Sequence, residues 1–244
     1  STQYANNDPG TDPDNRPSFD TSTKILGASS MLFGHTRDDA VVVDDNDLLD
    51  FSTDTPFTLS TWIKRGGNTP SQFGGMIVKA AQTNASDSPF EGYALWFNDT
   101  QQRKPAFYLY RNISNPPGIE QLRVAADSFP MTNSDTDWHN IVVTYNGNSN
   151  LSGVKMYFDG SSIAISLTAT DTLDPGDDIT TSTDLCFAGF INNAGANPPS
   201  RLYSFDGNMD EIAIWSKELS AAEVAASYNG GAGVDLTNGK PDDG

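Results

Sequence analysis

From Thr23 onward, short apolar segments alternate with clusters of turn-forming residues every 8–15 positions. The segments are rich in β-branched and aromatic residues, and short strands at such regular spacing are typical of an antiparallel sandwich. The expected strands are Ser30–Phe33, Ala40–Val43, Phe57–Lys64, Gly75–Lys79, Tyr93–Asn98, Ala106–Arg111, Gln121–Ala125, Trp138–Tyr145, Val154–Phe158, Ser162–Leu167, Leu185–Ile191 and Asn208–Trp215.

Several segments alternate apolar and polar residues with a period of two, which is the pattern of a half-buried strand. The residues expected to share a buried face are Phe57, Leu59 and Ile63, then Ile141, Val143 and Tyr145, and then Val154, Met156 and Phe158. The pairs Asn146-Gly147 and Asp159-Gly160 indicate hairpin turns, because Asn and Gly tolerate positive φ. These patterns predict an all-β fold.

One helix is expected near the C-terminus. Ser220 and Glu223 have the spacing of a capping box, with Ser220 as the N-cap. An apolar stripe follows at helical spacing, formed by Ala221, Val224, Ala225 and Tyr228, and the helix should end at Asn229-Gly230-Gly231. A helix this short is marginal in isolation, so we expect it to dock on the sandwich.

The two ends of the chain differ in composition from the middle. Residues 1–20 contain Pro9, Pro13 and Pro17 and few apolar side chains, which predicts a flexible arm rather than a strand-rich segment. Residues 230–244 predict a flexible tail or linker. A single domain is therefore expected over residues 21–229.

Charge and cysteine content exclude several classes. The chain has 32 acidic and 14 basic residues and a formal net charge of −18, which disfavours nucleic acid and anionic membrane surfaces as partners. No apolar run approaches the roughly 20 residues of a membrane-spanning helix, so no membrane insertion is expected. Cys186 lies in an apolar run and is expected to be a buried, inert thiol. The acids are 27 Asp against 5 Glu, a composition that favours turns and supplies oxygen ligands suited to calcium.

Four blocks of the sequence resemble laminin-G-like, concanavalin A-like jelly rolls. They occur in the family order and are Phe57–Lys64, Trp138–Gly147, Val154–Gly160 and Phe205–Trp215 followed by Lys217–Ser220. The resemblance covers roughly Thr23 to Asn229 and implies a two-sheet antiparallel jelly-roll sandwich with a concave face and one short C-terminal helix. It also implies a binding or adhesion module, often one for glycans and often one with calcium, although some catalytic families share this architecture.

Catalytic patterns are not apparent. Glycoside hydrolysis normally needs two carboxylates on one cleft, and jelly-roll glucanases carry alternating acids along one strand, which no strand here has. A polysaccharide lyase needs a His or Tyr base. The two histidines are His35, expected in a solvated turn, and His139, expected to be structural. We therefore predict that the protein is not an enzyme and has no catalytic residues.

A metal site is expected at Asp210. This residue shares the alternation phase of Ile212 and Ile214, so its carboxylate is predicted to point toward the apolar side and to need a partner there. Basic residues are scarce, and the resemblance implies a structural calcium at this Asp, where the early strand passes. The expected ligand set is Asp210 with Asp20 and Gly34. The alternative is a carboxylate bonded to turn amides without a metal.

A second acidic cluster is a weaker candidate for calcium. It comprises Asp38, Asp39, Asp44, Asp45, Asp47 and Asp50. Six acids in thirteen positions repel one another unless they are solvated or bound to a cation. The spacing does not fit an EF-hand, and a solvated surface is the default interpretation.

Aromatic residues in the middle of the chain are candidates for sugar binding. The predicted ligand-binding residues are Trp96, Tyr108, Tyr110 and Asn112, since aromatic rings can stack on sugar faces and amides can bond to hydroxyls. Trp96 should face away from Tyr93 because their positions differ by three along a strand. The alternative is that these aromatic residues belong to the core.

Together these observations predict a non-enzymatic recognition or adhesion module that binds a glycan or cell-surface polymer. Calcium is expected to stabilise it, and the location is expected to be extracellular, at a cell surface or at a virion surface. A second hypothesis is a structural or assembly module that decorates a phage particle or adhesin stalk, with neighbouring domains or subunits as partners. A carbohydrate-active enzyme is the third.

Overall fold

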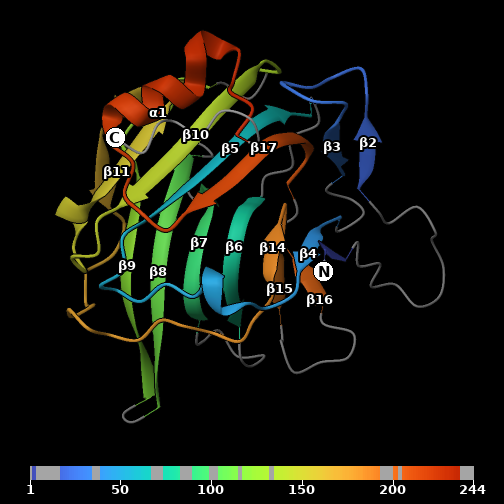
Figure 1. The fold of residues 1–244 in the computed structure, drawn as a ribbon. Coiled ribbons are helices and arrows are strands. Elements are labelled where there is room, and N and C mark those ends of the chain that lie inside the picture. Colours follow the sequence, from blue (N-terminus) through green and yellow to red (C-terminus); the bar gives the residue numbers. More distant parts are fainter. Residues whose placement is uncertain are drawn as a thin grey trace.

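The protein is a sandwich of two β-sheets with one α-helix lying across the outer face of one sheet (Figure 1). The computed structural model describes residues 2–3, 17–34, 39–66, 74–82, 90–98, 104–114, 117–131, 135–192, 200–202 and 205–236. The all-β jelly-roll fold with a short C-terminal helix is thereby confirmed.

The first sheet, here called the large sheet, has ten strands. Its main path is β1 (Thr2–Gln3), β4 (Val41–Val43), β14 (Leu185–Phe187), β6 (Gly74–Gln82), β7 (Phe90–Asn98), β8 (Lys104–Ser114), β9 (Pro117–Ala126) and β13 (Ile165–Leu167). Two short strands, β15 (Phe190–Asn192) and β16 (Ser200–Leu202), lie beside this path. All described pairs are antiparallel except β15 with β6.

The second sheet, here called the helix-covered sheet, has seven strands. Their order is β12 (Ser161–Ile163), β11 (Val154–Phe158), β10 (Trp138–Tyr145), β5 (Phe57–Arg65), β17 (Gly207–Trp215), β3 (Ser30–Phe33) and β2 (Ser18–Asp20). Short 3₁₀ helices cover Asp47–Leu49, Leu151–Gly153 and Asn229–Gly231.

The main core lies between the two sheets and takes alternate residues from each. The predicted inward residues of β5, β10 and β11 all belong to it, so the period-two interpretation is confirmed. Phe57 is near its centre, stacked on Phe51 with ring centroids 4.4 Å apart and in contact with Tyr93 and Tyr145. The buried Tyr145 hydroxyl donates to the Thr53 carbonyl at 2.6 Å, which satisfies its polar atom inside the core.

The strand predictions fail where one apolar run forms two separate strands. The run Ser162–Leu167 divides into β12 of the helix-covered sheet and β13 of the large sheet. The run Leu185–Ile191 breaks after β14, where Ala188 has a φ of 63°. The N-terminal segment, expected to be a flexible arm and not strand-rich, contributes the short strands β1 and β2. They pair with β4 and β3 through backbone hydrogen bonds, which the pattern of side chains does not predict. The domain limits at residues 20 and 229 stay a prediction.

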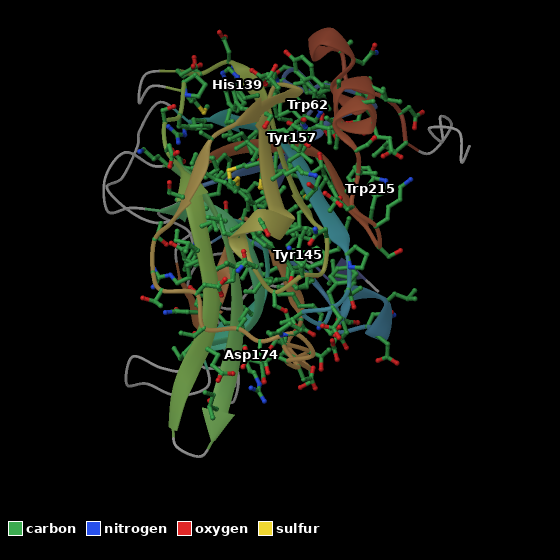
Figure 2. All side chains as sticks on the ribbon, turned by 90° about the vertical axis from the view of Figure 1, so that its left-hand side faces the viewer. Trp62, His139, Tyr145, Tyr157, Asp174 and Trp215 are labelled. Carbon is green, nitrogen blue, oxygen red and sulfur yellow. The ribbon has the colours of Figure 1, made fainter. Side chains whose placement is uncertain are left out.

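The predicted helix is confirmed as α1 (Ala221–Tyr228), with the capping box of Ser220 and Glu223 in place. It docks on the outer face of the helix-covered sheet. Val224 is fully buried there against Val142, Tyr157 and Leu219. Tyr228 stacks on Trp62 with ring centroids 5.4 Å apart, and Figure 2 shows Trp62, Tyr157 and Trp215 on this side of the molecule.

The buried stripe of α1 is narrower than the sequence predicted, because Ala221 and Ala225 are exposed. In the described part of the chain, no helix has the length and apolar character required to cross a bilayer. Cys186, the single cysteine of the sequence, is buried, as expected.

Candidate functional site

The four predicted ligand-binding residues lie on one face of the large sheet, the face turned away from the main core. Trp96 of β7 and Tyr108, Tyr110 and Asn112 of β8 alternate with residues that point inward. Tyr93 is one of those inward residues and belongs to the main core, whereas Trp96, Tyr108 and Tyr110 form a separate cluster. The expectation that Trp96 and Tyr93 face opposite ways is therefore confirmed.

The three rings form what we call the outer aromatic cluster (Trp96, Tyr108 and Tyr110). Trp96 and Tyr108 meet edge to face with centroids 4.9 Å apart, and Tyr108 and Tyr110 do the same at 5.6 Å. Ala106 and Ala125 complete the cluster. The rings are 6 %, 0 % and 4 % exposed, respectively, so they form a closely packed floor and do not offer open stacking faces.

Polar side chains stand beside this floor and make up what we call the polar rim (Asn112, Gln121 and Arg123). Gln121 and Arg123 are the cross-strand partners of Tyr110 and Tyr108, so they share the same face of the sheet. All three rim residues are half-buried. The Arg123 guanidinium carbon lies 4.6 Å from the centre of the Tyr108 ring. The rim side chains are thus more accessible than the aromatic rings beside them.

Sequence reasoning found Asn112 but missed Gln121 and Arg123. The signal was present in the predicted strand Gln121–Ala125, where Leu122 and Val124 alternate with Gln121 and Arg123. Only the pairing of β9 with β8 shows that these two polar residues lie beside the aromatic cluster.

The predicted orientation of Asp210 is wrong, because a β-bulge lies between Asp210 and Ala213 of β17. Glu211 occupies the bulge with a φ of 45°. A bulge shifts the alternation by one residue, so Met209 and Ile212 face the core while Asp210 faces outward beside Trp62. The alternation argument that placed Asp210 with Ile212 and Ile214 does not hold across this irregularity.

The described partners of Asp210 are hydrogen-bond donors. One carboxylate oxygen accepts from the backbone N–H groups of Ile25 and Leu26, at 2.7 and 3.3 Å, and the other accepts from Glu211 N–H at 3.1 Å. Asp20 is occupied in a similar way, because its Oδ1 accepts from the N–H and hydroxyl of Ser22 and from Thr23 N–H. These hydrogen bonds, those from Ser22 first, lower the pKa of Asp20 to about 2.

The expected calcium ligand set does not fit this arrangement. In the pairing of β17 with β3, Met209 lies opposite Met31 and Gly207 lies opposite Phe33. Asp210 therefore lies at one end of the paired segment, and Gly34 lies beyond the other end. Gly34 N–H donates to Asp39 Oδ2 instead. Among the described residues, no group of three or more Asp, Glu, His or Cys side chains could hold a metal ion. Calcium binding by the protein stays a prediction, while the Asp210 geometry favours the metal-free alternative.

Replacement of Asp210 tests this interpretation. Asp210→Asn keeps one acceptor oxygen but removes the charge and the second acceptor, so we expect the free energy of unfolding to fall by about 1–3 kcal/mol. The loss should be equal in excess calcium and in excess chelator, as measured by urea denaturation. A wild-type stability that rises with calcium, and a variant that has lost this rise, would restore the calcium site.

The second acidic cluster has an internal cation. Lys79 of β6 is fully buried, and its ammonium lies 2.7 Å from Asp45 Oδ1, 2.7 Å from Asp50 Oδ1 and 2.6 Å from the Thr181 carbonyl. The carboxylates of Asp45 and Asp50 are thus compensated in part by the charge of one lysine. Asp38, like the candidate base His35, lies outside the described residues.

His139 lies between two carboxylates. Its Nδ1 is 2.8 Å from Asp159 Oδ2, its Nε2 is 3.3 Å from Asp135 Oδ2, and its ring stacks on Phe158. The hydrogen bond with Asp159 raises the pKa of His139, and the charges of Asp159 and Asp135 act in the same direction against the opposing effect of burial. His139 therefore connects the β11–β12 turn to β10, in keeping with its predicted structural role.

This arrangement predicts a pH dependence of stability. Because the folded pKa of His139 is above the unfolded value of 6.5, its stabilising effect is complete below pH 6.5 and is lost as pH rises through the folded pKa. We expect the stability difference between wild type and His139→Gln, measured by urea denaturation, to be largest below pH 6.5 and to shrink as the pH rises above it. A difference that stays constant with pH would contradict the ion pairs.

The arrangement of two face-to-face antiparallel sheets, with a polar and aromatic face on one of them, defines a lectin-like jelly roll. A family model described as the concanavalin A-like lectin/glucanases superfamily matches residues 35–225. The chain belongs to this superfamily. No curated protein sequence matches the chain.

Solved structures share the fold at low sequence identity. The binding domain of Paraclostridial Mosquitocidal Protein 1 matches with a TM-score of 0.55 and 13% identity over 87% of this chain and 45% of that chain. The botulinum neurotoxin serotype G binding domain matches with a TM-score of 0.54 and 12% identity over 87% and 46%. The receptor binding domain of botulinum neurotoxin D gives 0.51 and 16% over 95% and 48%. This chain thus spans less than half of each of these structures.

Proposed function

We propose that the protein is a non-enzymatic recognition module that binds a glycan, on an extracellular or virion surface, through the polar rim of the large sheet. The observation that carries the proposal is the placement of Asn112, Gln121 and Arg123 on one face, beside a rigid floor of buried aromatic rings. Amide and guanidinium groups bond readily to sugar hydroxyls, and a packed floor holds them in place before a ligand arrives.

The fold supports this class of function without specifying a ligand. The superfamily includes lectins, and the solved structures with a similar fold are described as binding or receptor-binding domains. A lectin-like sandwich hosts several functions, so the residues of the site carry the proposal. Calcium stabilisation remains part of the proposal, with its location open.

A glycan array, run in excess calcium and in excess chelator, tests the proposal. We expect a restricted set of glycans to bind the wild-type protein. Asn112→Ala should weaken binding by about threefold to tenfold, which is the effect of one lost hydrogen bond. Asn148→Ala makes the same substitution at an exposed position in the β10–β11 connection, and it should leave binding unchanged.

Three outcomes would count against the proposal. An empty array together with ordered multimers would support the structural or assembly hypothesis. Release of reducing sugar from a bound polysaccharide would support the enzyme hypothesis. Equal weakening by Asn112→Ala and Asn148→Ala would place the binding site away from the polar rim.

A further inference from the structure

Arg123 is a half-buried cation that has no carboxylate partner among the described residues. The chain has 32 acidic and 14 basic residues, so an acid close to each cation is the ordinary expectation. No carboxylate of a described residue forms an ion pair with Arg123. Burial lowers the pKa of its guanidinium, and the hydroxyls of Tyr108 and Tyr110 raise it. Its Nε–H is buried and has no acceptor among the described residues.

Several other basic residues of the protein lie beside acids, whereas Lys24, Lys64 and Lys104 donate to backbone carbonyls. Arg111, the neighbour of Asn112 on β8, lies with its Nη1 2.6 Å from Glu120 and 2.8 Å from Asp177. Lys79 contacts two aspartates, and His139 lies between two others. Both Arg111 and Arg123 are on the β8–β9 hairpin. In the described part of the chain, carboxylates lie beside Arg111, which is on the opposite face, and not beside Arg123.

The aromatic floor explains the position of Arg123 but does not satisfy its donors. The guanidinium lies over the Tyr108 ring, which stabilises a cation. Its Nη2 donates to the Tyr108 hydroxyl at 3.5 Å, which makes this a long and weak hydrogen bond. An arginine has five N–H donors, so the described residues leave most of the hydrogen-bonding capacity of Arg123 for another group.

We propose that Arg123 is the subsite for the carboxylate of an acidic sugar, with the Asn112 and Gln121 amides bonding to the hydroxyls of the same ligand. This assignment rests on the proposed glycan-binding function. The planar guanidinium fork matches a carboxylate with two parallel hydrogen bonds, and the half-buried setting strengthens the attraction.

The net charge limits the kind of acidic glycan. At −18 the protein repels a polyanion at long range, so many acidic groups along one polymer are unfavourable. A largely neutral glycan with a single carboxylated sugar, such as a terminal sialic or uronic acid, avoids most of this repulsion. It retains the local contact with Arg123.

Matched oligosaccharides that differ by one carboxylate test the subsite. The probes are sialyllactose against its carboxyl-reduced derivative, and a glucuronic-acid-terminated disaccharide against its glucose-terminated counterpart, with a sulfated disaccharide as a further arm. By calorimetry, we expect at least one carboxylated probe to bind about tenfold to hundredfold more tightly than its neutral partner. Arg123→Gln should abolish this preference, and Arg123→Lys should retain part of it, because it keeps the charge but loses the fork.

Lys155→Gln is the charge-matched control, because Lys155 is an exposed cation on the helix-covered sheet. It should leave the preference unchanged, and melting curves should confirm that all variants are folded. Equal binding of neutral and carboxylated probes would overturn the Arg123 subsite while leaving the glycan-binding function intact. A preference for the sulfated probe alone would overturn the carboxylate assignment. Binding of no sugar in any arm would overturn both proposals, and capture of an acidic peptide instead would point to a protein partner.

Discussion

Lys79→Met should lower the free energy of unfolding by about 3 kcal/mol. The substitution keeps a side chain of similar length but leaves Asp45, Asp50 and the Thr181 carbonyl without their cation. Removing one partner of a buried ion pair typically destabilises a protein by about 3–5 kcal/mol. The lower end applies here because the Asp45 and Asp50 side chains are 33 % and 24 % exposed and solvent can screen them in part. Urea denaturation measures the change.

Two further variants test whether the loss of stability comes from the broken ion pairs of Lys79 or would follow the removal of any lysine. Lys155→Met removes a lysine that pairs with Glu218 at the surface, and it should change stability by less than about 1 kcal/mol. Adding Asp45→Asn and Asp50→Asn to Lys79→Met removes the uncompensated charges, so the triple variant should recover part of the loss. If the triple variant is less stable than Lys79→Met alone, repulsion between the aspartates is not the cause.

Val224→Asp should destabilise the protein by about 2–4 kcal/mol, because Val224 is the fully buried contact of α1 with the helix-covered sheet. The carboxylate would enter a cluster formed by Val142, Tyr157 and Leu219. Melting curves and urea denaturation measure the loss.

Ala225→Asp is the matched control, since Ala225 is the next residue of the same helix and is exposed. It should lower stability by less than about 1 kcal/mol, which is the intrinsic helix preference for Ala over Asp. Equal losses at residues 224 and 225 would mean that α1 docks through a broader stripe than the structure shows.

The local features of the fold could be predicted from the sequence because they depend on neighbouring residues. The capping box of Ser220 and Glu223 lies within one helical turn, and the Asp159-Gly160 turn depends on two residues that adopt positive φ, as they do here. The inward faces of β5, β10 and β11 follow from strict alternation. The expectation that Trp96 and Tyr93 face opposite ways rests on the same geometry.

The candidate site was predicted only in part. Trp96, Tyr108, Tyr110 and Asn112 share a face by alternation within two strands, but the sequence could not show that their rings are buried. Arg123 joins them only through the register of β9 on β8. That register depends on contacts between strands, which a single sequence does not contain.

By itself, therefore, the sequence determined the β-sandwich class, the position of the C-terminal helix and the inward residues of its regular strands, because each of these depends on short-range periodicity and turn chemistry. Tertiary structure alone decided the orientation of Asp210, since a bulge at Glu211 reverses the alternation that predicted it. It also decided that Lys79 pairs with both Asp45 and Asp50, and that Arg123 faces outward with no acid beside it among the described residues. These facts follow from segments that are distant in the chain and adjacent in space, where packing and charge pairing set the outcome.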